Sequence, residues 1–287
     1  MRSRAAAILV ALSSSCVVLQ SCGLFGPDET EPVGVEIRTQ SLKGYLAFPV
    51  NYDSTATYPL LVGLHGNGGS AAEFAGAFST FGEESLVVAV AQGEYAKSGG
   101  GYSWFYLTED RSLWEAYDTR SVNTLVELIG AIRARYRIGK VFVLGFSQGV
   151  SLAYMTGLRN PSLVSGVLAI SGYVPEIDQV GSVVHAQDVA AGSGVKLFIA
   201  RGFSDAVVPR EVFTAQRDFF TANGYDVTAR EYPGGHYITD DLQVEIRVWL
   251  RQAARQPAGP VRNLPPASSR GAASIPPPHP RAPAPPR

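Results

Sequence analysis

Short apolar runs alternate with amphipathic segments through the middle of the chain. Near-continuous apolar stretches of strand length occur at 58–66, 85–93, 140–146, 165–172 and 195–202. Segments with apolar residues at helical spacing lie between or after them, at 71–85, 121–137, 148–158 and 209–224. Strands that are apolar on both faces and separated by helices predict an α/β fold with a mostly parallel sheet and helices on both faces.

The two ends of this region complete the predicted sheet. Segments 33–39 and 42–50 alternate apolar and polar residues more strictly, so we expect them to form an antiparallel edge. A last strand is expected at 226–233, followed by an amphipathic helix at 239–254 with Thr239 as its N-cap. The pattern therefore predicts one domain at 33–255 with about eight strands.

The chain termini do not follow this pattern. Residues 1–21 begin with positive charges and continue with an apolar stretch, as a secretory signal does. The small residues before Cys22 resemble a bacterial lipobox, which implies lipidation of Cys22 and a cell-envelope location; a secreted or periplasmic protein is the alternative. Residues 22–32 read as a polar tether. Residues 256–287 hold eleven of the nineteen prolines and predict a disordered tail.

Charge and cysteine usage exclude several functions for the predicted domain. The net charge is −1, and no basic stripe predicts a nucleic-acid partner. Both cysteines, Cys16 and Cys22, lie in or beside the export segment. The domain therefore has no disulfide, no thiolate nucleophile and no cysteine metal site. We expect membrane contact through lipidated Cys22 only, and the sequence makes no prediction of oligomeric state.

The strand at 140–146 leads directly into the segment Gly145-Phe146-Ser147-Gln148-Gly149 and then into a helix. Two glycines around a serine allow the strand and the helix to approach closely at a sharp turn, which lifts the serine hydroxyl clear of the sheet. A chance match of common residue types is the alternative. The flanking strand and helix favour Ser147 as a nucleophile.

A serine hydroxyl needs a base, and the base needs a carboxylate. His236 follows the last strand, and Asp205 follows the strand at 195–202, so chain order is Ser, acid, His. The alternatives are a capping histidine and an Asx turn. Weaker candidates for the acid and the base are Asp178, Asp226, Asp240, Asp241, His65, His185 and His279.

Acyl transfer also needs donors for an oxyanion. The backbone N–H of Gln148, one residue after the serine, is one candidate. The glycine-rich loop after the strand at 58–66 supplies the other, and we assign it to the backbone N–H of Asn67. A simple strand-to-helix turn is the alternative interpretation of this loop.

Four segments in order resemble the α/β-hydrolase superfamily, most closely its phospholipase/carboxylesterase family. They are LHGNGG (64–69), GFSQG (145–149), GFSDAVVP (202–209) and YPGGH (232–236). The resemblance covers about 33–254 and implies an α/β-hydrolase fold with Ser147, Asp205 and His236 as its triad. Gly69 stands where the family often has an acidic residue, and Val150 where it often has glycine. Secreted polyester depolymerases and feruloyl esterases are similar at the same segments.

Residues 93–118 interrupt the rhythm of strands and helices with an aromatic-rich insertion, and a smaller insertion follows at 173–194. YSWF (102–105) looks like the family's Trp-Phe segment. We expect Trp104 and Phe105 to form a pocket wall beside Ser147; an aromatic satellite core is the alternative.

The leading hypothesis is a serine hydrolase that cleaves carboxylic esters of small molecules through an acyl-enzyme. It needs neither a metal nor an organic cofactor. An exported serine peptidase of the same fold is a second hypothesis, although no extra domain or paired-glutamate motif accompanies the triad. A non-catalytic envelope lipoprotein that binds ligands is a third. An intact triad favours the esterase over this binding module.

Overall fold

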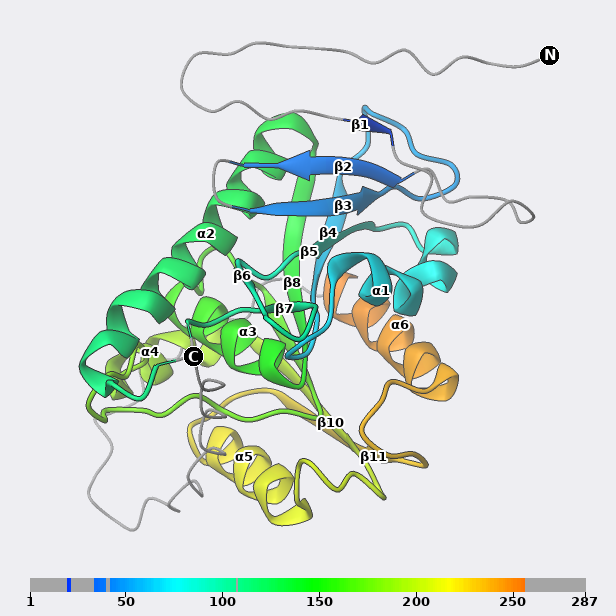
Figure 1. Ribbon diagram of the computed structural model, residues 1–287. Helices are drawn as coiled ribbons and strands as arrows, with labels where there is room; N and C mark the ends of the chain where they lie inside the picture. Colours follow the sequence, from blue (N-terminus) through cyan, green and yellow to red (C-terminus); the bar gives the residue numbers. More distant parts are fainter. Residues whose placement is uncertain (1–19, 22–33, 40–41, 107, 256–287) are drawn as a thin grey trace, which may run out of the picture.

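The computed structural model describes residues 20–21, 34–39, 42–106 and 108–255 (Figure 1). One large sheet runs through this part of the chain. Its strands, in spatial order, are β1 (Gln20–Ser21), β2 (Gly34–Arg38), β3 (Lys43–Ala47), β5 (Val87–Ala91), β4 (Tyr58–Leu64), β8 (Ile138–Phe146), β9 (Gly166–Ile170), β10 (Lys196–Gly202) and β11 (Val227–Tyr232). The strands from β5 to β11 in this order are parallel, whereas β1, β2 and β3 pair antiparallel at one edge. The predicted mostly parallel sheet with an antiparallel edge is therefore confirmed.

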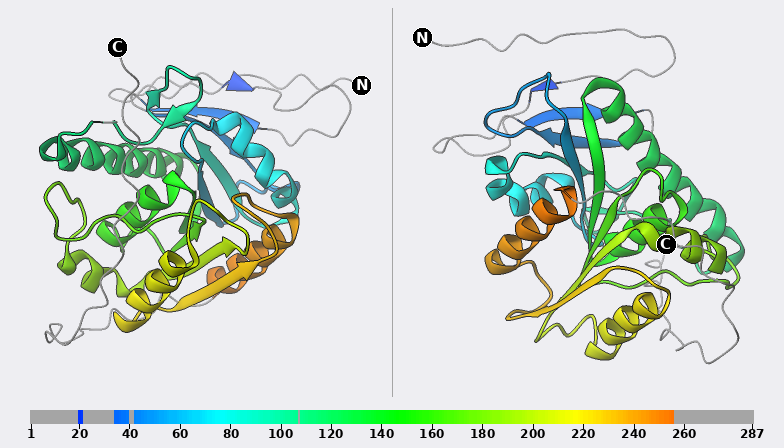
Figure 2. Two further views of the ribbon diagram at one scale, coloured as in Figure 1. Left: turned by 60° about the horizontal axis from the view of Figure 1, so that its bottom comes forward. Right: turned by 180° about the vertical axis from the view of Figure 1, so that it is seen from behind.

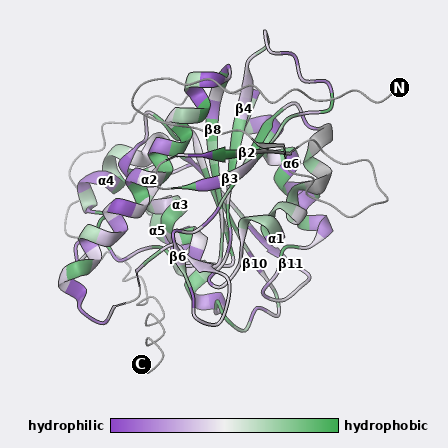
Figure 3. Ribbon diagram, turned by 45° about the horizontal axis from the view of Figure 1, so that its top comes forward, coloured by the Kyte–Doolittle hydropathy of each residue, from purple (hydrophilic) through white to green (hydrophobic). Residues whose placement is uncertain are grey.

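Each central strand buries both of its faces. In β8, Val141 and Val143 belong to one hydrophobic core, whereas Phe142 and Leu144 belong to the core on the opposite face. This follows from the period of two along a strand, which sends neighbouring side chains to opposite faces. In Figure 3, by contrast, the outer helices α2 and α4 mix hydrophilic (purple) and hydrophobic (green) residues.

Helices cover the two faces in two groups. The first core is closed by α2 (Trp114–Arg135), α3 (Gln148–Arg159), α4 (Ala186–Ala191) and α5 (Arg210–Ala222). The other core is closed by α1 (Ala71–Ala75), the 3₁₀ helix η1 (Gly76–Glu83) and α6 (Asp240–Arg255). Figures 1 and 2 show α1 and α6 on one side of the sheet and α2, α3 and α5 on the other.

The helix predicted at 71–85 is wrong in its second half, where η1 replaces it. The segment contains Gly76, Ser79, Thr80 and Gly82, which are weak α-helix formers. In a 3₁₀ helix, residues three apart lie on the same face. Phe78 and Phe81 are therefore both buried against the sheet.

The helix predicted at 121–137 begins seven residues earlier, at Trp114. Its first two turns lack an apolar stripe because they pack against the aromatic insertion rather than the sheet. The rings of Tyr106 and Tyr117 stack with centroids 4.5 Å apart. The insertion also contains a two-stranded hairpin of β6 (Tyr95–Ala96) and β7 (Tyr102–Ser103) and the short 3₁₀ helix η2 (Arg111–Leu113). A further 3₁₀ turn, η3 (Gly192–Gly194), ends the second insertion.

The predicted tether and tail lie outside the described residues, as does Cys22. Of the predicted signal segment, only Gln20 and Ser21 are described, as strand β1. The signal, the lipidation and the disordered tail therefore stay predictions. Within the described ranges, no helix combines the length and apolarity needed to cross a bilayer, and no group of metal-ligating side chains is found.

Candidate active site

The backbone at Ser147 is strained. Ser147 joins β8 to α3 with φ 53° and ψ −117°, a conformation that L-residues rarely adopt. Its N–H donates to the Ile170 carbonyl of β9 at 3.0 Å. A Cβ on Gly145 would lie 2.3 Å from the Gly149 carbonyl oxygen, and one on Gly149 would lie 2.5 Å from that of Leu64. The sharp turn predicted from the two glycines is thus present, and its strain is held by close backbone contacts.

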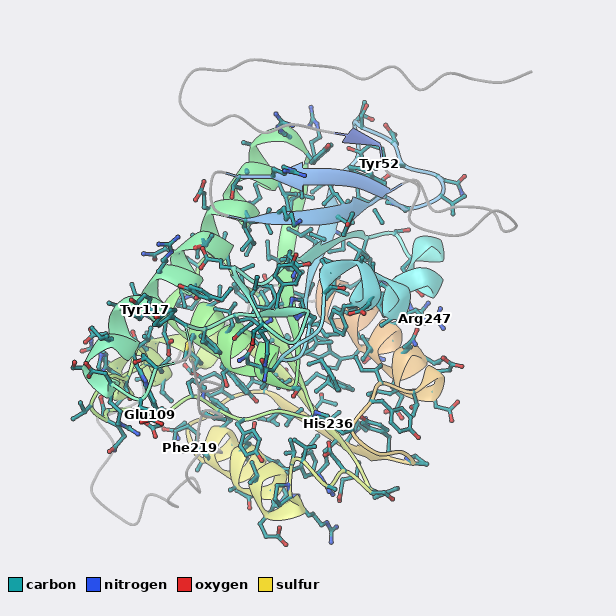
Figure 4. The ribbon with its side chains drawn as sticks, viewed as in Figure 1. Tyr52, Glu109, Tyr117, Phe219, His236 and Arg247 are labelled. Carbon is teal, nitrogen blue, oxygen red and sulfur yellow. The ribbon has the colours of Figure 1, made fainter. Side chains whose placement is uncertain are left out.

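Three loops bring Ser147, His236 and Asp205 into one hydrogen-bonded chain. The Ser147 Oγ lies 3.0 Å from His236 Nε2. His236 Nδ1 lies 3.1 and 3.0 Å from Asp205 Oδ1 and Oδ2. Figure 4 labels His236 on the loop between β11 and α6. The three residues follow β8, β10 and β11, whose carboxyl ends share one edge of the parallel sheet.

Asp205 is a buried carboxylate that is held ionised. It is 4% exposed, and burial by itself would raise its pKa. Its Oδ1 accepts the N–H groups of Val207 and Val208, both at 2.9 Å. Together with hydrogen bonds from His236 and Ser171, these donors outweigh burial and lower the pKa of Asp205 below its ordinary value. An ionised carboxylate at this place keeps a proton on His236 Nδ1, which leaves Nε2 free to accept one.

A buried arginine supports the loop that carries Asp205. Arg201 donates to the Asp205 carbonyl at 3.0 Å and to the Val208 carbonyl at 3.1 Å. Its charge is balanced by Glu231 at 3.1 Å, which also pairs with exposed Arg210. The sequence analysis missed Arg201. An arginine inside the apolar strand VKLFIARG was the signal available, because a buried charge needs partners close by.

The loop that carries His236 is tied to the loop that carries Asp205. The Ser204 N–H donates to the Gly234 carbonyl at 2.8 Å. A Cβ on Gly202 would lie 2.3 Å from the Gly235 carbonyl oxygen. The two loops are therefore so close that only glycine fits at position 202. Next to His236, the Tyr237 carbonyl accepts the Tyr232 hydroxyl at 2.7 Å. These contacts fix the histidine and aspartate loops relative to each other.

The loop of Asn67 lies beside the serine. A Cβ on Gly66 would be 3.3 Å from the Ser147 Cβ, which places this loop against the turn. The Asn67 side chain is exposed, and its Oδ1 accepts the Lys97 ammonium at 2.9 Å. The Gln148 N–H belongs to the first residue of α3, where backbone N–H groups have no partner within the helix. Gly66, the residue before Asn67, and Gln148 therefore both lie next to Ser147, and the role of the two backbone amides as oxyanion donors stays a prediction.

Trp104 and Phe105, predicted to form a pocket wall beside Ser147, lie instead in the core, so the structure does not support this prediction. They are 1% and 5% exposed and belong to the core beneath α2 and α3. The Trp104 indole N–H donates to the His65 carbonyl at 2.7 Å. The tryptophan therefore belongs to the main core and fastens the aromatic insertion to the end of β4, rather than forming a pocket wall or a separate satellite core.

His65 has a structural position in this region that the sequence analysis did not assign. It is 1% exposed, and its Nδ1 lies 2.7 Å from the Gly66 carbonyl oxygen. Its Nε2 accepts the Gly93 N–H at 3.0 Å, which requires the neutral ring with the proton on Nδ1. Burial lowers the pKa of His65, in agreement with a neutral ring.

The sequence pattern of a known family covers most of the chain. The model of the phospholipase/carboxylesterase family matches residues 48–251. The chain belongs to this family. Members of the family are hydrolases of the esterase and thioesterase type, and they share the α/β-hydrolase fold.

Two relatives with names are similar to parts of this chain. Acyl-protein thioesterase 1 of Gibberella zeae is 28% identical over 114 residues. The probable carboxylesterase SOBER1-like of Arabidopsis thaliana is 26% identical over 163 residues. The matches cover 39% and 52% of this chain and 48% and 58% of those proteins, so the matched regions span about half of each relative.

Solved structures show the fold. Esterase PE8 has a TM-score of 0.61 at 24% identity, covering 74% of this chain and 99% of that structure. The carboxylesterase from Mesorhizobium loti has a TM-score of 0.60 at 19% identity, covering 74% and 95%.

Proposed function

We propose that this family member is a serine hydrolase that cleaves carboxylic esters of small molecules through an acyl-enzyme. The observation that carries the proposal is the hydrogen-bonded chain from Ser147 Oγ through His236 to Asp205. Its order and distances are those that a serine nucleophile requires. The names of its relatives, carboxylesterase and thioesterase, support the same chemistry.

In the proposed mechanism, Ser147 Oγ attacks the acyl carbon while His236 Nε2 takes the hydroxyl proton. Asp205 stabilises the resulting imidazolium, because it is ionised and buried next to Nδ1. The oxyanion accepts hydrogen bonds from the N–H groups of Asn67 and Gln148. His236 then gives the proton to the leaving alcohol and activates water, which hydrolyses the acyl-enzyme and restores Ser147.

The proposal is tested with a fluorophosphonate probe and p-nitrophenyl acetate. We expect the wild type to be labelled and active, and Ser147→Ala to be neither. Folded wild type that resists the probe would favour the binding module instead. Faster cleavage of aminoacyl-nitroanilides than of esters would favour the peptidase.

A substrate panel then defines the acyl and alcohol groups. It contains p-nitrophenyl esters of rising acyl length, a feruloyl ester, a short polyester and an acyl thioester of matched chain length. The thioester is included because several relatives are named thioesterases. A higher kcat/KM for the thioester than for the matched oxyester would replace the carboxylic-ester assignment with thioester hydrolysis.

A further inference from the structure

The β6–β7 hairpin pairs with the loop of Asn67 through its backbone. The Gly68 N–H donates to the Tyr102 carbonyl at 2.8 Å, and the Tyr102 N–H donates to the Gly69 carbonyl at 2.9 Å. Gly101 has φ 69°, and a Cβ there would lie 1.8 Å from the Gly68 carbonyl oxygen. The approach of the hairpin to this loop is thus possible only with glycine at 101.

Ser103 of β7 and Trp104, the residue directly after the hairpin, hold the side chain of Gln148. The Gln148 Oε1 accepts the Trp104 N–H at 3.0 Å, and its Nε2 donates to Ser103 Oγ at 3.1 Å. Ser103 is 1% exposed, and its Oγ donates in turn to the Phe105 carbonyl at 2.9 Å. The carboxamide of Gln148 is therefore bound by two groups of one short segment.

Residues 102–104 consequently contact both sides of the oxyanion site. Tyr102 binds the loop of one proposed donor, and Ser103 and Trp104 bind the residue that carries the other. The segment itself is anchored in the core by the Trp104 indole, which donates to the His65 carbonyl. Since this anchor does not involve Gln148, the segment keeps its place when the Gln148 side chain is removed.

We infer that residues 102–104 form a clamp that fixes the two oxyanion donors relative to each other, with Gln148 (through its side chain) and Ser103 as positioning residues. The inference rests on the proposed ester hydrolysis. Donors that are held in place before the reaction cost no reorganisation when the oxyanion forms. Displacement of one donor by about 1 Å is enough to lower the rate about 10²-fold. The clamp therefore acts on the transition state and leaves substrate binding unchanged.

The test is Gln148→Met, which keeps the length of the side chain and the backbone N–H but removes both hydrogen bonds. We expect kcat for p-nitrophenyl acetate to fall about 10- to 100-fold, with KM changed less than about twofold. Affinity for a trifluoromethyl ketone, whose hemiketal with serine carries the same oxyanion, is expected to fall by a similar factor. A purely structural role would leave this affinity unchanged.

Two further variants complete the experiment. Asn160→Ala is the matched control, because it removes a carboxamide hydrogen bond to the Thr156 carbonyl at the far end of α3. It is expected to keep wild-type kcat and analogue affinity. Ser103→Ala removes one contact of the clamp and is expected to lower kcat about 3- to 10-fold. If Gln148→Met does not fold, Ser103→Ala tests the clamp by itself, and wild-type kcat in this variant would overturn the clamp.

The outcomes separate the clamp from the proposed function. Wild-type kcat and analogue affinity in folded Gln148→Met, with fluorophosphonate labelling of Ser147 intact, would overturn the clamp alone. Wild-type protein that is folded but neither labelled nor active would overturn the proposed function and the clamp with it. A parallel fall in kcat and analogue affinity at unchanged KM supports the clamp.

Discussion

Replacing Arg201 with methionine tests whether a buried cation holds the aspartate loop. The Arg201 side chain is 6% exposed and binds the carbonyl oxygens of Asp205 and Val208 and the carboxylate of Glu231. Methionine is similarly long and unbranched but donates no hydrogen bond. Arg201→Met therefore leaves two buried carbonyl groups without donors, while Glu231 keeps its ion pair with Arg210.

The expected cost follows from these contacts. A buried polar group that loses its partner costs about 1–3 kcal/mol, which gives about 2–6 kcal/mol for the two carbonyls. Methionine packing in the core recovers part of this cost. We expect the free energy of unfolding to fall by about 3 kcal/mol. With a slope of about 2 kcal/mol per molar urea, the unfolding midpoint would move down by about 1.5 M.

The assay is urea unfolding followed by tryptophan fluorescence, with esterase activity measured in the absence of urea. Arg210→Met is the matched control, since it removes a cation from the same carboxylate but its side chain is 70% exposed. A surface pair of this kind contributes less than about 1 kcal/mol. If both variants lose the same small amount of stability, Arg201 does not hold the loop and the reasoning is refuted.

Three further predictions concern single residues. Asp205→Asn is expected to lower kcat about 10³- to 10⁴-fold, measured with p-nitrophenyl acetate, because the histidine loses its ionised partner; a loss below tenfold would contradict this. The lowered pKa of His65 means that its contribution to stability is complete above the unfolded value of about 6.5 and is lost as pH falls below it. His65→Gln should therefore show a shallower fall in urea midpoint between pH 7 and pH 5 than the wild type, and an equal slope would count against the burial argument. Gly149→Ala should lower the melting temperature and kcat together, because its Cβ would meet the Leu64 carbonyl oxygen; wild-type values would show that the turn has room.

The sequence predicted the three residues of the candidate site, but not the residues that hold their loops in place. Ser147, Asp205 and His236 were predictable because each stands in a loop directly after a strand, and parallel strands end at one edge. Arg201 and Ser171 were not predicted because their partners are backbone groups or residues distant in sequence. Such contacts depend on which strands are neighbours and on their register, and the pattern of apolar residues predicts neither.

Burial explains the errors around the aromatic insertion. Trp104 was predicted to form a pocket wall beside Ser147 because it lies in a long aromatic insertion and in a segment that looks like the family's Trp-Phe segment. The sequence has no signal for the hydrogen bond from its indole to the His65 carbonyl, which ties it to the end of β4. The start of α2 was also missed, since its first two turns pack on the insertion and lack a helical apolar stripe.

The geometry at Ser147 depends on residues outside the proposed triad. A non-glycine residue at φ 53° costs of order 1–3 kcal/mol and persists only where the surroundings determine it. Here they do so through β9, whose Ile170 carbonyl accepts the Ser147 N–H, and through Gly172, where a Cβ would lie 2.4 Å from the Ser147 carbonyl oxygen. The aspartate and histidine loops are held in the same way, by Arg201 and by Tyr232. Substitution of any of these supports should therefore lower stability and activity together, whereas substitution within the triad should lower activity while the fold remains intact.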